Sequence, residues 1–178
     1  NIESIYLIYI VMLKQKYYLD LIDHSFLINP ICALLGPRQC GKTTLSKQYS
    51  ENNKLQTHFF DLEDPTDLSK LDNPKLALVS LEGLIVIDEI QRKENLFPYL
   101  RVLVDKYPEK RILVLGSASQ DLIRQSSETL AGRISYIEMT PFAIHEVNDT
   151  YKLWNRGGFP KSYLATSERI SSEWRKSY

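Results

Sequence analysis

The chain of 178 residues has little of several features that would define its class at once. Its two cysteines, Cys32 and Cys40, are too few for a disulfide framework. They fit a reducing cytoplasm, where we expect the protein to reside. Lysine and arginine number 22 together, as do aspartate and glutamate, so no net charge attracts nucleic acid or a membrane surface. Internal repeats and low-complexity segments are absent as well.

Long hydrophobic runs are also missing. The most apolar stretch, residues 5–13, is far shorter than the roughly 20 residues that a membrane helix needs. It lacks the basic leader and the small-residue cleavage site of a signal peptide. We therefore expect no membrane span, and we predict one or two helices over residues 5–23 that pack on the following domain. A helix that binds a membrane surface or a partner is the less favoured alternative, because Asp20 and Asp23 interrupt its apolar face.

What the sequence does contain is an ordinary globular composition and one specific motif. The apolar fraction of 43% and the charged fraction of 25% suit a single domain with a full core. Residues 36–43 match the phosphate-loop pattern G-x-x-x-x-G-K-[ST] at every fixed position. The apolar residues 31–35 before the motif predict a buried strand, and residues 45–49 after it predict the first turns of a helix. This is the context that a phosphate loop requires.

The chemistry of the motif indicates which groups would contact a nucleotide. Gly36 and Gly41 allow the backbone to curl so that its N–H groups point at a phosphate, next to the positive end of the helix. Lys42 would reach the β- and γ-phosphates, and the Thr43 hydroxyl would bind Mg²⁺. We expect the nucleotide to be bound by nine consecutive residues: Gly36, Pro37, Arg38, Gln39, Cys40, Gly41, Lys42, Thr43 and Thr44.

A second diagnostic stretch lies at residues 84–89, where four apolar residues precede Asp88 and Glu89. Such a run predicts a parallel strand that is covered on both faces. Its acids would then lie at the carboxyl edge of the sheet, where open α/β sheets bind ligands. We expect Asp88 to hold Mg²⁺ directly or through water, and Glu89 to accept a proton from the attacking water or to orient it.

Further polar residues follow other predicted strands. Ser117 comes just after the strand that begins at residue 111, and its hydroxyl is predicted to contact the γ-phosphate or the attacking water. A plain turn is the alternative, with Ser119 capping the helix over residues 120–125. Asp61 lies near the end of the strand expected over residues 56–62, and Glu63 lies in the turn that follows. For both, a role as solvated turn carboxylates is favoured over a role in the site.

The remaining pattern divides the chain. An amphipathic helix is expected over residues 95–106, and a fifth strand over residues 134–139. A short helix is expected to end at Val147, before a Gly-Gly and aromatic boundary at residues 154–160. We predict three parts, namely an N-terminal helical segment (1–28), a nucleotide-binding core (29–150), and the start of a truncated C-terminal domain (151–178).

Five motifs occur in one order, and together they resemble a large group of prokaryotic AAA-type ATPases over about residues 17–178. They are Gly-Pro-Arg-Gln-x-Gly-Lys-Thr-Thr-Leu, Ile-Asp-Glu-Ile-Gln, Gly-Ser-x-Ser, Leu-Ala-Gly-Arg and Gly-Gly-Phe-Pro. The resemblance implies a three-layer α/β fold with a five-stranded parallel sheet in the order 5-1-4-3-2 and helices on both faces. It also implies a C-terminal domain, often nuclease-like, that is essentially missing here.

Carried over to this sequence, the resemblance makes Lys42 the phosphate contact and Asp88 the magnesium ligand. It makes Glu89 the base and Ser117 the polar sensor. Arg133 is implied as an arginine finger or sensor, because an arginine at the γ-phosphate stabilises the charge that builds up during phosphoryl transfer. Arg38 and Arg156 compete for this role, and a structural ion pair is the alternative for Arg133. Cys40 stands where the group often has valine, and its position at a helix N-terminus predicts a lowered thiol pKa.

We therefore predict that the protein is an ATPase, which hydrolyses ATP with Mg²⁺ and couples this reaction to a conformational change or to a partner. A nucleotide-binding switch with little or no hydrolysis is the alternative, although a pure binder would not need Glu89. A GTPase is not favoured, because residues 53–56 fail the Asn-Lys-x-Asp pattern at its last position. The expected ligands are ATP and ADP, and a protein partner or self-association is left open. DNA would be a partner only through the missing domain, and the charge does not indicate it.

Overall fold

The computed structural model describes residues 16–178, and most of the predicted N-terminal helical stretch lies outside the described residues. Its strands are β1 (Ile31–Leu35), β2 (Thr57–Asp61), β3 (Leu84–Asp88), β4 (Arg111–Gly116) and β5 (Ile134–Glu138). The strands form one parallel sheet in the order β2-β3-β4-β1-β5. This confirms the predicted sheet, since the order 5-1-4-3-2 is the same arrangement described from the other edge.

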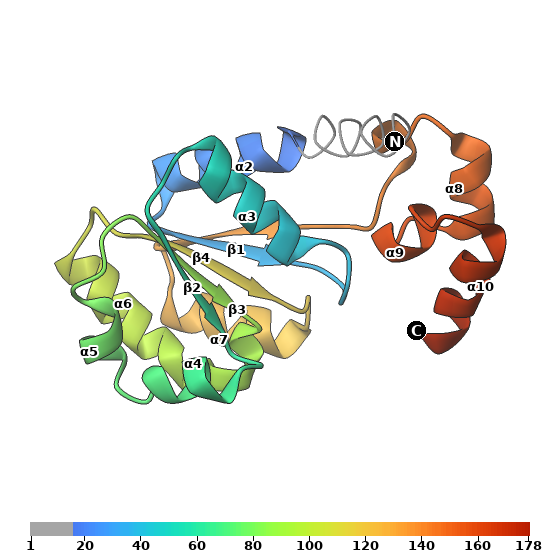
Figure 1. Ribbon diagram of the computed structural model, residues 1–178. Coiled ribbons are helices and arrows are strands. Elements are labelled where there is room, and N and C mark those ends of the chain that lie inside the picture. The colour runs from blue at the N-terminus through green and yellow to red at the C-terminus, as the bar shows by residue number, and fades with distance from the viewer. Residues whose placement is uncertain (1–15) are drawn as a thin grey trace.

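Helices cover both faces of the sheet (Figure 1). On one face lie α2 (Lys16–Ile28) and α3 (Lys42–Asn52). The other face carries α4 (Pro65–Lys70), α5 (Pro74–Leu78), the 3₁₀ segment η1 (Ile90–Leu96), α6 (Phe97–Lys106) and α7 (Gln120–Thr129). No helix within residues 16–178 is long and apolar enough to cross a membrane.

Each central strand contributes to two separate hydrophobic clusters, because neighbouring side chains in a strand point to opposite faces. In β1, Ile31, Ala33 and Leu35 pack in the cluster with α5, α6 and α7. Cys32 and Leu34 pack in the other cluster, with α2 and α3. The central strands are therefore buried on both sides, which explains their continuous apolar sequence.

The chain leaves the sheet after β5 and continues through the short 3₁₀ segment η2 (Ile144–Glu146), where a short helix was predicted. It ends in three helices, α8 (Thr150–Arg156), α9 (Pro160–Tyr163) and α10 (Glu168–Ser177), which lie together to one side of the layers (Figure 1). Contacts that connect these helices to the rest of the chain include the packing of the Phe142 ring against Tyr163 of α9. The Phe142 N–H donates to the Gly158 carbonyl at 2.8 Å, and the Tyr178 hydroxyl donates to the Arg38 carbonyl at 3.3 Å.

Candidate functional site

The loop between β1 and α3 depends on two glycines for different reasons. Gly36 donates its N–H to the Gly116 carbonyl at 3.2 Å, and a Cβ at this position would lie 2.2 Å from the Met139 carbonyl oxygen. Glycine is therefore required for space. Gly41, at the N-cap of α3, has φ of 109°, a conformation that residues with a Cβ rarely adopt. Together they let the loop turn tightly into a helix N-terminus, the feature that binds anions.

The Lys42 ammonium is held inside this loop. Nζ donates to the carbonyls of Gly36 and Pro37, both at 2.9 Å, and the residue is only 6% exposed. Within residues 16–178, no carboxylate lies at ion-pair distance from it. A buried cation that is neutralised by no carboxylate favours an anionic ligand, because neutral carbonyls satisfy its hydrogen bonds but leave its charge.

The predicted magnesium residues lie together at the carboxyl edge of the sheet. The Thr43 hydroxyl, in the first turn of α3, donates to Asp88 Oδ2 at 2.6 Å. The other carboxylate oxygen accepts the Glu89 N–H at 2.9 Å, which orients the Asp88 side chain at the end of β3. A hydroxyl and a carboxylate are hard oxygen donors, and Mg²⁺ commonly takes one or two carboxylates together with phosphate oxygens and waters. The two residues therefore fit this ion.

Glu89 has the backbone conformation that marks many functional residues. Its φ of 55° and ψ of 44° lie in the left-handed region, which is uncommon for residues other than glycine. Its side chain accepts a hydrogen bond from the Gln91 amide. Residues with such strained backbones cluster at active sites, so this observation supports the predicted role of Glu89 independently of the motif.

Gln91 is a site residue that the sequence interpretation missed. Besides contacting Glu89, it packs against the end of β4, where a Cβ on Gly116 would lie 3.0 Å from Gln91 Oε1. That oxygen is buried and accepts no hydrogen bond from residues 16–178. The only available signal was the Ile-Asp-Glu-Ile-Gln motif, in which Gln91 follows the two acids by two positions.

Ser117 and Ser119 lie just beyond β4, which is hydrogen-bonded to both β1 and β3. The Ser119 side chain accepts from the Leu122 N–H at 3.3 Å and caps α7, as predicted. Ser117 follows Gly116 at the edge that also carries Gly36 and Asp88, because the three strands are parallel neighbours. The fold thus brings Ser117 to the predicted edge, and its sensor role stays a prediction.

The placement of Arg133 corrects the sequence interpretation, which put it near the phosphates. Arg133 immediately precedes β5, and its carbonyl accepts the N–H of Ile31, the first residue of β1. The phosphate loop follows the last residue of β1, so Arg133 lies at the opposite edge of the sheet. Its guanidinium donates to both carboxylate oxygens of Asp105, at 2.5 and 3.0 Å, and lowers the pKa of that acid. Within the described residues Arg133 therefore forms the ion pair of the alternative interpretation, and a role as a finger toward a neighbouring molecule stays a prediction.

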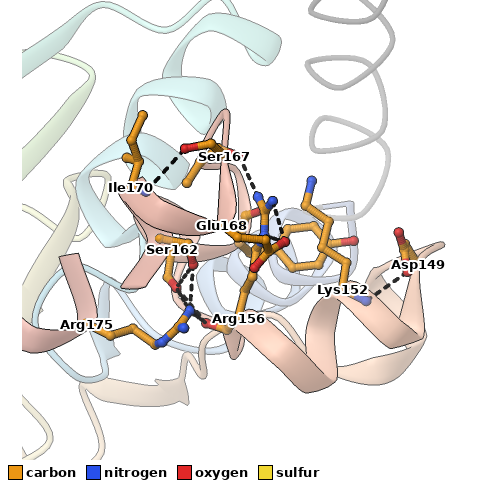
Figure 2. Close-up of polar contacts among 11 residues, drawn as sticks. Asp149, Lys152, Arg156, Ser162, Ser167, Glu168, Ile170 and Arg175 are labelled. Atoms are coloured by element: carbon orange, nitrogen blue, oxygen red, sulfur yellow. Dashed lines mark hydrogen bonds and ion pairs between the residues drawn. The ribbon is translucent and has the colours of Figure 1, made fainter. Parts of the chain in front are cut away.

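Arg156, the third arginine considered, is also structural in this fold (Figure 2). It is 8% exposed, and its guanidinium lies 2.6 Å from Glu168 Oε1. The same guanidinium donates to the carbonyls of Tyr163 and Ala165. Its own carbonyl accepts the Ser162 hydroxyl at 2.6 Å, so this buried arginine joins α8, α9 and α10.

The expectation of a lowered pKa at Cys40 is wrong. The thiol is almost fully buried, and burial disfavours the charged thiolate. Burial raises the pKa of Cys40, and the nearby Lys42 charge only partly offsets this effect. Cys40 therefore contributes to packing under the loop rather than to redox chemistry.

The fold is that of a P-loop NTPase. It combines a parallel sheet, a loop that two glycines allow to turn into a helix, and a threonine–aspartate pair at the carboxyl edge of the sheet. A model of the AAA domain matches residues 28–148, and the chain belongs to this family. The family implies nucleotide binding of the ATPase type.

The chain is also similar to two curated proteins and to a solved structure. The uncharacterized proteins Mb2031c of Mycobacterium bovis and Rv2008c of Mycobacterium tuberculosis are each 47% identical over 152 residues, which cover 84% of this chain and 34% of the relative. The chain therefore spans about a third of the length of the curated relatives it matches. The Walker-type ATPase of Pyrococcus abyssi is similar with a TM-score of 0.58 and 14% identity, over 88% of this chain and 66% of that one. At this identity the likeness concerns the fold alone.

Proposed function

We propose that the protein binds ATP with Mg²⁺ and hydrolyses ATP to ADP and phosphate, and that turnover drives a conformational change or acts on a partner. The observation that carries the proposal is the convergence of Lys42, the Thr43–Asp88 pair and Glu89 at one edge of the sheet. A site that only binds ATP with Mg²⁺ would need Lys42 and the Thr43–Asp88 pair, but not Glu89. Glu89, with its left-handed backbone conformation, is the additional part that hydrolysis requires.

Each residue has a definite task in this proposal. Lys42 and the loop N–H groups bind the phosphates, and Thr43 with Asp88 would hold Mg²⁺, which neutralises charge on the phosphate oxygens when bound. In hydrolysis, the water oxygen bonds to the γ-phosphorus as the bond to the ADP oxygen breaks. Glu89 accepts the proton that the water releases. Ser117 hydrogen-bonds the γ-phosphate or the attacking water.

The partner is a protein or a second copy of the chain in this proposal. The formal net charge of zero gives no support for DNA binding by these residues, so DNA would require a further domain. Turnover should therefore be measured with and without DNA and across a range of protein concentrations. A rise in activity per molecule with concentration is the result expected for self-association.

The decisive experiment compares turnover in the parent and in Glu89→Gln. Glutamine keeps the shape of the side chain and removes the base, so we expect ATP binding to persist while turnover falls roughly 10²- to 10⁴-fold. Glu109→Gln is the matched control, since this exposed glutamate precedes β4 at the opposite edge. Parent-like turnover in Glu89→Gln would assign the base to another residue, with Asp61 and Glu63 next to test.

A second function, a nucleotide-binding switch with little hydrolysis, is favoured by one contact. The Gln91 amide donates a hydrogen bond to the Glu89 carboxylate, and this bond engages the group that would act as the base. The same experiment separates the two functions. A parent that binds ATP with Mg²⁺ but shows no turnover above the protein-free background is a switch.

A further inference from the structure

Three charged side chains from three segments meet beside the phosphate loop. Arg38 lies in the loop, Glu63 lies in the turn after β2, and Arg92 lies in η1 after the acids of β3. Arg38 Nη2 is 3.0 Å from Glu63 Oε1, and Arg92 Nη1 is 3.8 Å from the same oxygen. All three side chains are about half-exposed or more. One carboxylate thus faces two guanidinium groups at the edge that carries the candidate site.

This cluster has more positive charge and more hydrogen-bond donors than its single carboxylate can use. The two guanidinium groups carry two positive charges against one negative charge, and each has five N–H donors. Arg38 donates one hydrogen bond from its guanidinium to Glu63, and the Arg92 guanidinium donates none within residues 16–178. The remaining donors and the excess charge are suited to a second anion.

The backbones of both arginines are joined to residues of the candidate site. Arg38 directly follows Pro37, whose carbonyl accepts a hydrogen bond from Lys42. The Arg92 N–H donates to the Glu89 carbonyl at 2.9 Å. Both guanidinium groups are therefore carried by segments that also carry residues of the candidate site. Arg133 and Arg156 are placed differently, because Arg133 precedes β5 at the opposite edge of the sheet and Arg156 is buried among α8, α9 and α10.

We propose that Arg38 and Arg92 bind the γ-phosphate of ATP from within the same molecule, and that Glu63 competes for them when no triphosphate is present. The inference rests on the proposed function. Exposed ion pairs contribute little stability, so their carboxylate is readily replaced. A terminal phosphate carries more charge than a carboxylate and accepts the bidentate donors of arginine. The cluster thereby makes the site selective for triphosphate over diphosphate.

The experiment measures dissociation constants for ADP and for the β,γ-imido analogue of ATP, each with Mg²⁺. We expect Arg38→Gln and Arg92→Gln each to weaken binding of the analogue roughly tenfold, as for a lost hydrogen bond to a charged group, with ADP binding unchanged. Glu63→Gln should strengthen binding of the analogue, and this gain should disappear when both arginines are replaced.

Arg169→Gln is the matched control, because Arg169 forms a comparable exposed pair with Glu173 on α10, with 2.8 Å between Nε and Oε1. It should leave both constants unchanged. An unchanged ratio of analogue to ADP affinity in the arginine variants would overturn this inference while leaving the proposed function intact. A parent that binds neither nucleotide would overturn both. Melting temperatures close to that of the parent would show that the exposed substitutions leave the fold intact.

Discussion

The carboxyl and amino edges of this sheet are made by the same five strands, but their polar groups are satisfied to different degrees. At the amino edge, Arg133 and Asp105 form a bidentate pair that uses both carboxylate oxygens. At the carboxyl edge, Lys42 is buried among neutral carbonyls, and the Glu63 carboxylate faces two guanidinium groups. A charged group that is paired with an opposite charge needs no ligand. A positive group without enough negative partners indicates where an anionic ligand would bind.

Lys42→Ala, at the carboxyl edge, should have the largest effect of the substitutions at the two edges. In the parent, the ATP analogue with Mg²⁺ at a hundred times its dissociation constant should stabilise the fold by about 2.7 kcal/mol. Lys42→Ala should lose most of this gain, because the loop then lacks its buried cation. Thermal melts with and without the ligand measure the effect.

Lys47→Ala is the control for that measurement, since Lys47 is exposed on the same helix, α3. Its melting temperature should rise with ligand as in the parent. An unchanged melting temperature of the parent at millimolar ligand would contradict the assignment of the carboxyl edge as a nucleotide site.

The second test compares one glycine from each edge. A Cβ on Gly36 would lie 2.2 Å from the Met139 carbonyl oxygen, so Gly36→Ala forces the backbone to move, at a cost of about 3 kcal/mol. Gly132 has φ of 72° and open space around the added Cβ, so Gly132→Ala meets only the left-handed strain of about 1 kcal/mol. Urea unfolding gives both values. Equal costs would show that the loop relaxes freely and would remove the steric difference between the edges.

The smallest expected effect is that of Arg133→Ala at the amino edge. ATP binding and turnover should match those of the parent, because the residue lies across the sheet from the loop. A tenfold fall in turnover with unchanged binding would instead identify it as a finger that acts on a neighbouring molecule.

The stability of Arg133→Ala should depend on pH in a defined direction. Arg133 lowers the pKa of Asp105 in the folded protein, so the pair stabilises the fold above the unfolded pKa of about 3.9. This contribution is lost as the pH falls through the lower, folded pKa. The difference in stability between parent and variant should therefore be present at neutral pH and disappear in acid, which urea unfolding at several pH values can measure.

Local pattern was sufficient for much of the architecture. The apolar run at residues 31–35 is β1 as predicted, and Ser119 caps α7, because both features depend on neighbours within a few residues. The phosphate loop and the two acids after β3 were recognisable for the same reason. The loop and the acids were expected to lie close together, because parallel strands end at the same edge of the sheet.

The contacts between charged or polar side chains from different segments could not be predicted from local pattern. Arg38 and Arg92 are distant in sequence, and they meet Glu63 only because β1, β2 and β3 all end at the carboxyl edge of one parallel sheet. Gln91 lies against Gly116 because η1 packs next to the end of β4.

The sequence by itself determined the strands, the phosphate loop and the identity of the acids at its edge, because hydrophobic spacing and glycine conformation are local properties. Tertiary structure alone decided the ion-pair partners of Arg38, Arg133 and Arg156, and the burial that raises the pKa of Cys40. A guanidinium can pair with any carboxylate within its reach, and the electrostatic environment of a thiol depends on everything packed around it. Only the folded chain specifies which groups those are.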